Sequence, residues 1–520
     1  MTGTVLSRRV FLGGLCAASA GCEGAAAQEG ARKVGYGGIA QQIRERARLL
    51  SLEPYVPKPV VAGDLTYDQY RSIRFNPSRA LWANRDDLAF QADFFHVGGL
   101  FKHEVALFEV AEGAARPIRY VPDMFDFGAE AEAIRAVADP AFAGLRLHHP
   151  MNGLNVSEFA VFLGASYFRA IGLGERYGLS ARGLAIRSGL PGEEFPYFES
   201  FWLEQPAPGD SAVTLHALLD SESVAGAYRF VMAPGESTVM DISVSLFARR
   251  KIENIGLAPI TSMFMRGEAD RGSVSDFRPQ IHDSEALSIR TGANDWLLRP
   301  LRNPKAIEIS AYADDNIQGF GLIQRDRDFN HYLDLEARYD LRPGLWVEPV
   351  GGWGAGEVRL VELPSPDETQ DNIVAFWTPN APLVPGEEFF FQYRLHWGPH
   401  PPVNPVLARV VGTYTGVGGI ASSPDPALRK FVIDFSGGPL KDLAPDVELR
   451  VDASATNAEI VASTVLRNVP LEGWRVFLDV RAEYGSSPEV RCVLKLNDQA
   501  ISEFWTIRWD PTEPDSTLPL

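Results

Sequence analysis

Cysteine is nearly absent from this sequence, which limits how the fold can be stabilised. Of three cysteines, Cys16 and Cys22 lie in the first 27 residues, so Cys492 is the only one in the rest of the chain. A single cysteine excludes an intramolecular disulfide and a cysteine metal cluster. We therefore expect stability to come from core burial, which a chain of 520 residues supplies readily.

Positive charge is also scarce. The formal net charge is -18 at pH 7, and because residues 1–27 carry Arg8, Arg9 and Glu23, a net of +1, the rest of the chain is near -19. Such an acidic surface is unfavourable for binding nucleic acid or an anionic membrane, whose own charge would repel it. It is compatible with a neutral ligand such as a sugar chain.

Several catalytic motifs are missing. The nine histidines show no His-Glu-x-x-His or comparable spacing, so we predict no metal site. No Gly-x-Ser-x-Gly elbow is present, which argues against a serine hydrolase even though His282 precedes Asp283. The glycine-rich stretch 351–356 lacks a strand-to-helix phosphate loop around it, so it predicts a hairpin, and we expect no cofactor. We interpret His282 as a hydrogen-bonded loop residue and Asp283 as the better catalytic candidate.

The apolar run from Leu12 to Ala20 is far too short to span a bilayer as a permanent helix. It follows Ser7-Arg8-Arg9-Val10-Phe11-Leu12, a twin-arginine pattern, and precedes Ala25-Ala26-Ala27, small residues suited to signal-peptidase cleavage before Gln28. This tripartite pattern predicts a twin-arginine signal peptide over residues 1–27. Because the twin-arginine route exports proteins that fold first, we predict a periplasmic protein.

Helical periodicity is rare in this chain. Residues 39–50, 65–73 and 129–137 are the segments that predict helices. Elsewhere the sequence shows short strands separated by glycine and proline, which number 47 and 37. The clearest predicted strands are 213–218, 227–233, 238–248, 306–310, 357–363 and 389–397. The fold class that this pattern predicts is all-β, with a β-sandwich as the natural architecture.

Four prolines lie within the nine residues 397–405, and proline fits neither a helix interior nor a central strand. We therefore predict one domain over residues 28–397, a linker over 398–405 and a second domain over 406–520. The second domain shows seven short predicted strands, the number expected of an immunoglobulin-like sandwich. These strands are 407–413, 430–435, 447–451, 459–465, 474–482, 489–496 and 502–509.

The run from Gly319 to Trp377 mixes carboxylates, arginines and aromatic rings without helical periodicity. A solvated face does not need so many rings, and a core tolerates charges only when they are paired. Asp367, Glu368 and Asp371 lie just before a predicted strand, on a loop of the kind that often carries catalytic groups. Inverting glycoside cleavage needs a carboxylic acid to protonate the leaving oxygen and a second group to activate water. Acid-rich loops are common, so the spacing alone is weak evidence for catalysis.

Other residues of the same run are candidates for binding a sugar. Tyr339 is suited to hydrogen-bond a sugar hydroxyl or a relay water, and Arg338 to raise the acidity of a neighbour, although an ion-paired turn is the alternative. Trp346, Trp353 and Trp377 are candidates for stacking on pyranose faces, although single tryptophans are more often core residues.

A second dense region runs from Gly164 to Trp202 and contains Tyr167 and Arg182. Rings, arginines and acids recur there, as they would along a carbohydrate cleft. A packed sheet with charged edges is an equally good interpretation of any one of these residues.

Taken together, these segments resemble the periplasmic glucan biosynthesis protein family, the G and D proteins of osmoregulated glucan synthesis. The twin-arginine signal resembles the D branch more than the G branch. The matching segments run in order through most of the chain after the signal. They are 164–169, 177–185, 192–196, 282–284, 299–301, 319–322, 338–343 and 371–379.

This resemblance implies a large N-terminal β-sandwich, joined by a short turn to an immunoglobulin-like C-terminal domain, and a cleft acting on β-1,2-glucan. Some members of the family are inverting β-1,2-glucanases, and some relatives transglycosylate. Carried over, the general acid falls on Asp371, and the base falls on Asp283, acting through waters or a substrate hydroxyl. Glu368 and Tyr339 match positions that support the proton path and the substrate. Asp371 would have to hold a proton near neutral pH, which the charge of Glu368 would favour.

Two classes of function follow. The first is an enzyme that cuts or transfers β-1,2-glucan, and the second is a non-catalytic glucan-binding scaffold that assists a membrane glucosyltransferase. The presence of Asp283, Glu368 and Asp371 favours the enzyme, because a pure binding protein has no need of all three.

Overall fold

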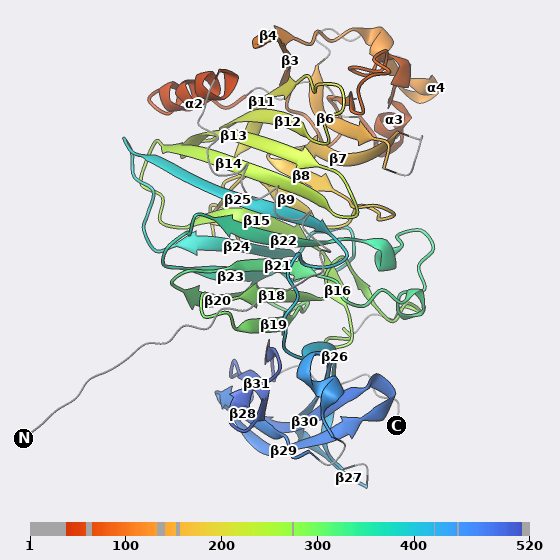
Figure 1. The fold of residues 1–520 in the computed structure, drawn as a ribbon, viewed down its shortest axis with the longest axis vertical. Coiled ribbons are helices and arrows are strands. Elements are labelled where there is room, and N and C mark those ends of the chain that lie inside the picture. The colour runs from red at the N-terminus through yellow and green to blue at the C-terminus, as the bar shows by residue number, and fades with distance from the viewer. Residues whose placement is uncertain are drawn as a thin grey trace, which may run out of the picture.

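The computed structural model describes residues 38–58, 65–132, 141–151, 156–272, 275–420, 422–444 and 447–511. The predicted signal peptide and the end of the predicted helix over 129–137 lie outside the described residues. Within these ranges the regular structure is mainly β-strand, in two large sheets and a smaller one (Figure 1). The predicted all-β fold is confirmed.

The first large sheet has ten strands, and its middle strands are buried along their whole length. In spatial order they are β2 (Gln91–His96), β6 (Phe142–His149), β7 (Ser157–Leu163), β8 (Tyr167–Ala170), β9 (Ser180–Arg182), β15 (Ile255–Ser262), β24 (Ile373–Pro379), β23 (Gly356–Glu362) and β20 (Glu308–Asp314), with β10 (Ala185–Ile186) paired to β15. β15 and β24 are buried at every position, which is why both are apolar runs without alternation.

The second large sheet has fifteen strands and crosses the whole molecule. In spatial order they are β28 (Arg450–Thr456), β31 (Glu489–Leu496), β33 (Phe504–Arg508), β19 (Trp296–Pro300), β18 (Ala286–Arg290), β21 (Gly319–Ile323), β22 (Gly344–Val350), β25 (Glu388–Gly398), β14 (Thr238–Ala248), β13 (Val224–Ala233), β12 (Val213–Asp220), β11 (Tyr197–Glu204), β3 (Ala106–Ala111) and β4 (Ala114–Pro117), with β32 (Gln499–Ala500) paired to β31. The period-two pattern of β14 sets its register, because Met240, Ile242 and Val244 all face the core.

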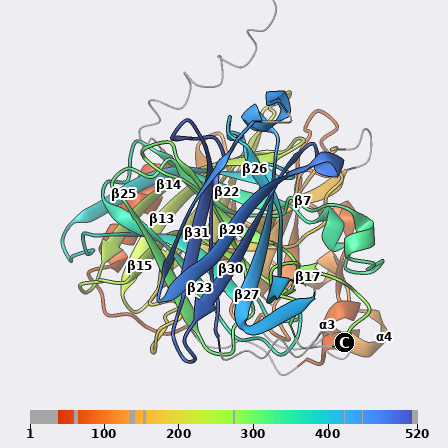
Figure 2. The same cartoon turned by 90° about the horizontal axis from the view of Figure 1, so that it is seen from below.

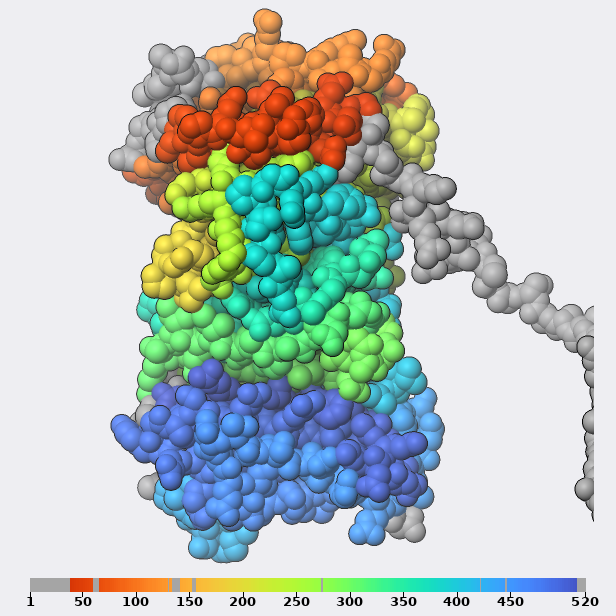
Figure 3. Space-filling model, turned by 90° about the vertical axis from the view of Figure 1, so that its left-hand side faces the viewer, coloured from red at the N-terminus to blue at the C-terminus, as the bar shows by residue number. Residues whose placement is uncertain are grey.

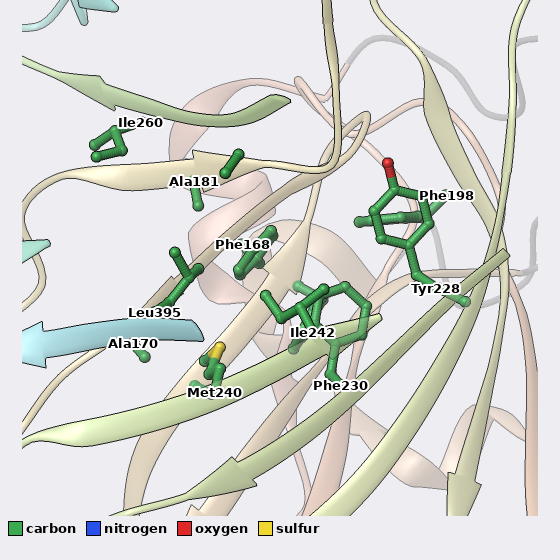
Figure 4. Packing of buried hydrophobic residues seen from close by; sticks show 14 of the residues in the cluster. Phe168, Ala170, Ala181, Phe198, Tyr228, Phe230, Met240, Ile242, Ile260 and Leu395 are labelled. Carbon is green, nitrogen blue, oxygen red and sulfur yellow. The ribbon is translucent and has the colours of Figure 1, made fainter. Parts of the chain in front are cut away.

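The main core lies between these two sheets. Phe168 of β8 packs edge-to-face on Phe230 of β13, with ring centroids 5.4 Å apart. Figure 4 shows these rings among Met240, Ile242 and Leu395, with side chains from both sheets pointing toward one another. Edge-to-face geometry suits the quadrupoles of aromatic rings, so these contacts stabilise a particular packing as well as burying area.

The C-terminal strands form a smaller sandwich at one end of the molecule (Figures 1 and 2). One layer is β26 (Arg409–Ile420), β27 (Ser423–Ser436), β30 (Gly473–Ala482) and β29 (Ala458–Asn468), and the other consists of β28, β31 and β33. Phe431 from one layer meets Trp505 from the other in a shared core. All seven strands predicted for this part are present, together with the two-residue β32.

The smaller sandwich is bonded to the large sheets rather than only tethered to them. β33 runs parallel to β19 and pairs with it, so one hydrogen-bonded sheet continues across the boundary. Fully buried Glu503 accepts hydrogen bonds from the Arg325 guanidinium at 2.7 and 2.8 Å and from the Val410 N–H at 2.9 Å. The parts of the chain before and after the proline-rich residues 398–405 are therefore joined by a shared sheet and a buried ion pair.

Helices occupy the periphery. Those in the described residues are α2 (Ile39–Leu50), α3 (Tyr67–Ser72) and α4 (Gly128–Ala131). α2 has the predicted bounds and lies across the outer face of β12 to β14 (Figure 3), where Ile43 and Ala47 are buried. The 3-10 turns are η2 (Pro77–Arg79), η3 (Pro122–Met124), η5 (Phe329–His331), η6 (Tyr339–Leu341), η7 (Gly438–Asp442) and η8 (Val469–Leu471), and β1 (Arg74–Phe75) pairs with β5 (Phe125–Asp126). None of the described helices is long and apolar enough to cross a membrane.

Candidate functional site

The predicted general acid lies on the connection between β23 and β24, residues 363–372, which we call the acid loop. Asn372 fixes the end of this loop. Its buried amide accepts from the Phe264 N–H at 2.8 Å and donates to the carbonyls of Phe264 and Leu363 at 3.0 Å. Asn303 holds the start of the loop by donating to the Ser365 carbonyl and accepting from the Ser365 N–H, each at 2.9 Å.

The middle of the acid loop is fixed by its own turn. The Asp367 carboxylate accepts from the Thr369 N–H at 2.9 Å and from the Thr369 hydroxyl at 2.5 Å. A side chain that bonds the backbone two residues on is typical of an Asx turn. Glu368 and Asp371 are therefore presented by a loop held at its start, middle and end.

Asp371 lines a cavity of about 520 Å³. Its side chain is 30 % exposed, and its carboxyl lies 3.7 Å from the Arg169 guanidinium of β8. The same cavity is lined by aromatic residues, including Tyr167, Phe101 and Tyr197. A concave site with several rings and a few charged groups is what a small or chain-like polar ligand requires. Of the four predicted catalytic residues, Asp371 is the one that lines this cavity.

Asp283 directly follows β17 (Ile281–His282), which pairs with β16 (Phe264–Arg266). Its side chain is 4 % exposed and forms an ion pair with Arg342. Burial raises the pKa of Asp283, the charge of Arg342 opposes this rise, and the charge of Asp371 adds to it. The structure thus brings the two predicted acid–base partners within electrostatic reach of each other, one on the cavity wall and one buried.

Tyr339 and Glu368 form a second link in the same site. The Tyr339 hydroxyl donates to Glu368 at 3.1 Å, and the Arg278 guanidinium lies 2.9 Å from the same carboxylate. The Tyr339 ring lies under Arg342 at 4.3 Å, a cation–π distance. Burial raises the pKa of Tyr339 well above its usual range, so its hydroxyl stays protonated and acts as a donor. Glu368, Tyr339, Arg342 and Asp283 therefore form one connected chain of contacts.

Three of the predicted sugar contacts, Trp346, Trp377 and Arg182, are corrected by the structure because their side chains are buried. Trp346 and Trp377 are 3 % and 0 % exposed, so neither ring can stack on a ligand. Arg338 forms a two-pronged ion pair with Asp340 and does not line the cavity. Arg182 is buried, bonded to Thr261, and lies 4.8 Å from the Tyr167 ring. Arg182 therefore supports Tyr167, which does line the cavity.

The sequence alone did not identify which arginines contact the acids. Arg169, Arg278 and Arg342 hold Asp371, Glu368 and Asp283 respectively. The available signal was their position within or beside the acidic segments, but spacing does not reveal which arginine faces which acid. Within the described parts of the chain, no group of three or more His, Cys, Asp or Glu side chains is arranged to hold a metal ion.

The fold and this site define a class of protein: a multi-sheet β protein whose cavity carries an acid loop with buried acid–arginine pairs beside it. The family model described as "Periplasmic glucan biosynthesis protein, MdoG" matches residues 39–509, and the chain belongs to this family.

Relatives named for both branches match over most of their length. "Glucans biosynthesis protein G" of Rhodopseudomonas palustris (strain BisA53) is 48% identical, covering 90% of this chain and 92% of its own. "Glucans biosynthesis protein D 1" of Ralstonia nicotianae is 46% identical, covering 90% and 91%. "Probable glucans biosynthesis protein D" of Shewanella oneidensis is 42% identical, covering 90% and 88%.

Proposed function

We propose that this protein is exported by the twin-arginine route and acts on β-1,2-glucan during periplasmic glucan biosynthesis, as an inverting glycoside hydrolase or transglycosylase. The family, and the names of relatives from both branches, support the role in glucan biosynthesis. One observation carries the catalytic part. Two carboxyl groups lie in unlike environments, Asp371 on the cavity wall near Arg169 and Asp283 buried against Arg342.

In this proposal Asp371 donates a proton to the leaving oxygen while Asp283 draws a proton from the attacking group. Asp283 is buried, so it acts through an intervening water or sugar hydroxyl, and Arg342 stabilises its ionised form. Tyr339 and Glu368 supply a hydrogen-bonded path beside these two acids.

The experiment is to incubate the purified mature protein with linear β-1,2-glucan and size the products by mass spectrometry, with linear β-1,3-glucan as the control. Short linear products establish a hydrolase, and cyclic products one water lighter establish a transglycosylase. Unchanged polymer with measurable binding overturns the catalytic proposal. It leaves a glucan-binding scaffold that assists a membrane glucosyltransferase.

Replacing Arg342 by Gln is expected to shift the acidic limb of the pH profile of kcat/KM upward. Arg342 opposes the rise in the pKa of Asp283 caused by burial, so its removal raises that pKa further. A base works only when ionised, so activity falls as the pH drops through its pKa, and a higher pKa makes this fall begin at higher pH. The measurement is kcat/KM between pH 4 and 8.

Arg338→Gln is the matched control for this shift. Arg338 lies in the same turn region but is paired with Asp340 rather than Asp283. The acidic limb should stay in place in that variant. An unmoved limb in Arg342→Gln would mean that Asp283 does not set it.

A further inference from the structure

His282 is fully buried directly beside Asp283, and both of its ring nitrogens face glutamine oxygens. Nδ1 lies 2.9 Å from Gln324 Oε1, and Nε2 lies 2.9 Å from Gln280 Oε1. The amide N–H groups of the two glutamines are used elsewhere. Gln324 donates to the Tyr339 carbonyl, and Gln280 donates to Asp326 at 2.6 Å. His282 is thus the centre of a buried hydrogen-bonded chain that ends at the backbone of Tyr339.

The two ends of this chain differ in whether they can take up a proton. Burial lowers the pKa of His282 to about 4, so near pH 7 the ring is neutral and carries one N–H. The bare nitrogen then needs a donor, and one glutamine has to turn its NH₂ toward it. A turned Gln324 would set its oxygen against the Tyr339 carbonyl, which has no proton to offer.

Gln280 has a different neighbour. It faces the Asp326 carboxyl, a group that, unlike a backbone carbonyl, has a form with an O–H donor. This carboxyl already accepts from His331 at 2.7 Å and from the Asp328 N–H at 3.1 Å. Gln280 is therefore the glutamine that can rotate its side-chain NH₂ toward His282. In each arrangement that satisfies the chain, the Nδ1 nitrogen of His282 keeps its proton and donates it to Gln324.

From this position His282 contacts the supports of the predicted catalytic residues. Its ring stacks on Phe264, with centroids 5.4 Å apart and planes 9° apart, and the Phe264 backbone holds Asn372, the residue after Asp371. Through Gln324 it reaches Tyr339, whose hydroxyl bonds Glu368 and whose ring lies under Arg342.

We propose that His282 is a positioning residue, whose Nδ1–H fixes Gln324 and thereby the placement of Tyr339, and so of Glu368 and of Arg342 on Asp283. The catalytic consequence rests on the proposed function of the site, whereas the Nδ1 proton does not. A small misplacement of groups around a reacting bond costs about 100-fold in rate, so a positioning residue without a ligand contact has a measurable effect.

Two variants distinguish the roles of the two imidazole nitrogens of His282. In His282→Asn the amide nitrogen takes the place of Nδ1, and in His282→Gln it takes the place of Nε2. Both lose the ring and its stacking on Phe264, so each controls for the other. We expect His282→Gln to lower kcat about 10- to 100-fold with KM little changed, and His282→Asn to stay within a few-fold of the parent. Equal losses in the two variants, or no loss in His282→Gln, would overturn the proposal.

A measurement on the unaltered protein keeps the test independent of activity and of variant folding. Nitrogen-15 NMR of the histidine side chains at pH 7 should show the proton of His282 on Nδ1. An unprotonated Nδ1 would contradict the proposed positioning role of His282 even if the protein cleaves glucan. Conversely, a protonated Nδ1 in a protein that leaves glucan intact would overturn the proposed function while keeping the arrangement of this chain.

Discussion

Replacing Asp371 by Asn is expected to lower kcat on β-1,2-glucan by about 10²- to 10⁴-fold, the usual contribution of a positioned general acid. Asn cannot give up a proton to the leaving oxygen but has nearly the same size, and its amide oxygen can face Arg169, which lies 3.7 Å from this carboxyl. Binding should therefore persist. Turnover is measured by product sizing, and binding by calorimetry with the same glucan.

Asp367→Asn is the matched control, because it removes one negative charge from the same loop. Asp367 builds its turn through a single oxygen, which Asn retains, so its activity should stay within a few-fold of the parent. A 4-nitrophenyl glycoside of a β-1,2-linked oligosaccharide adds a sharper test, since its leaving group needs no proton. It should restore the rate of Asp371→Asn but not that of Asp283→Asn. Equal defects on both substrates would contradict the acid role of Asp371.

The fold was predictable where local pattern decides the structure. β14 occupies the predicted residues 238–248 because alternating apolar positions fix both its face and its register. α2 has the predicted bounds because its apolar residues recur at helical spacing and pack on the outer face of a sheet. The join between β33 and β19 was not predictable, since parallel pairing of strands so far apart in sequence leaves no local signal.

The tryptophans show why residue type alone misleads. Trp346 lies across from Gly321 on β21, and a Cβ atom at Gly319 on the same strand would collide with its ring. Gly356 makes the same kind of room for Trp377. Glycines on neighbouring strands thus form slots that bury the rings in the core. The signal was present in the glycine positions, but it becomes readable only when the strand pairing is known.

The sequence pointed to the acids of the candidate site but not to their arginine partners. Glu368 and Asp371 cluster before a clear strand, and the role of Asp283 as base follows from the family resemblance. The arginines reach these acids from other segments, as Arg169 reaches Asp371 and Arg342 reaches Asp283. Arg338 is paired outside this set of acids, and the backbone at that residue is left-handed, with φ of 46°. The turn that follows pairs Arg338 with Asp340 and presents Arg342 to Asp283 instead.

Replacing Glu503 by Gln is expected to lower the free energy of unfolding by about 3–5 kcal/mol, because it leaves the Arg325 charge without its buried partner. Glu503 is fully buried, and the Arg325 side chain is 17% exposed. The measurement is chemical denaturation followed by tryptophan fluorescence, to which Trp505 of the adjoining core contributes.

Glu459→Gln is the control, because Glu459 pairs with Arg481 on the same small sandwich while both side chains are at least half exposed. Its cost should not exceed about 1 kcal/mol. The double variant Arg325→Met with Glu503→Leu removes both charges of the pair, but it leaves the Val410 N–H and carbonyl without these partners, so it should recover only part of the loss. A Glu503→Gln effect no larger than that of Glu459→Gln would mean that the paired strands β19 and β33 carry the joint without the ion pair. Arg325 directly precedes Asp326, which accepts from Gln280 at one end of the His282 chain, and Gln324 at the other end bonds Tyr339. A weakened joint is therefore expected to shift Tyr339 as well.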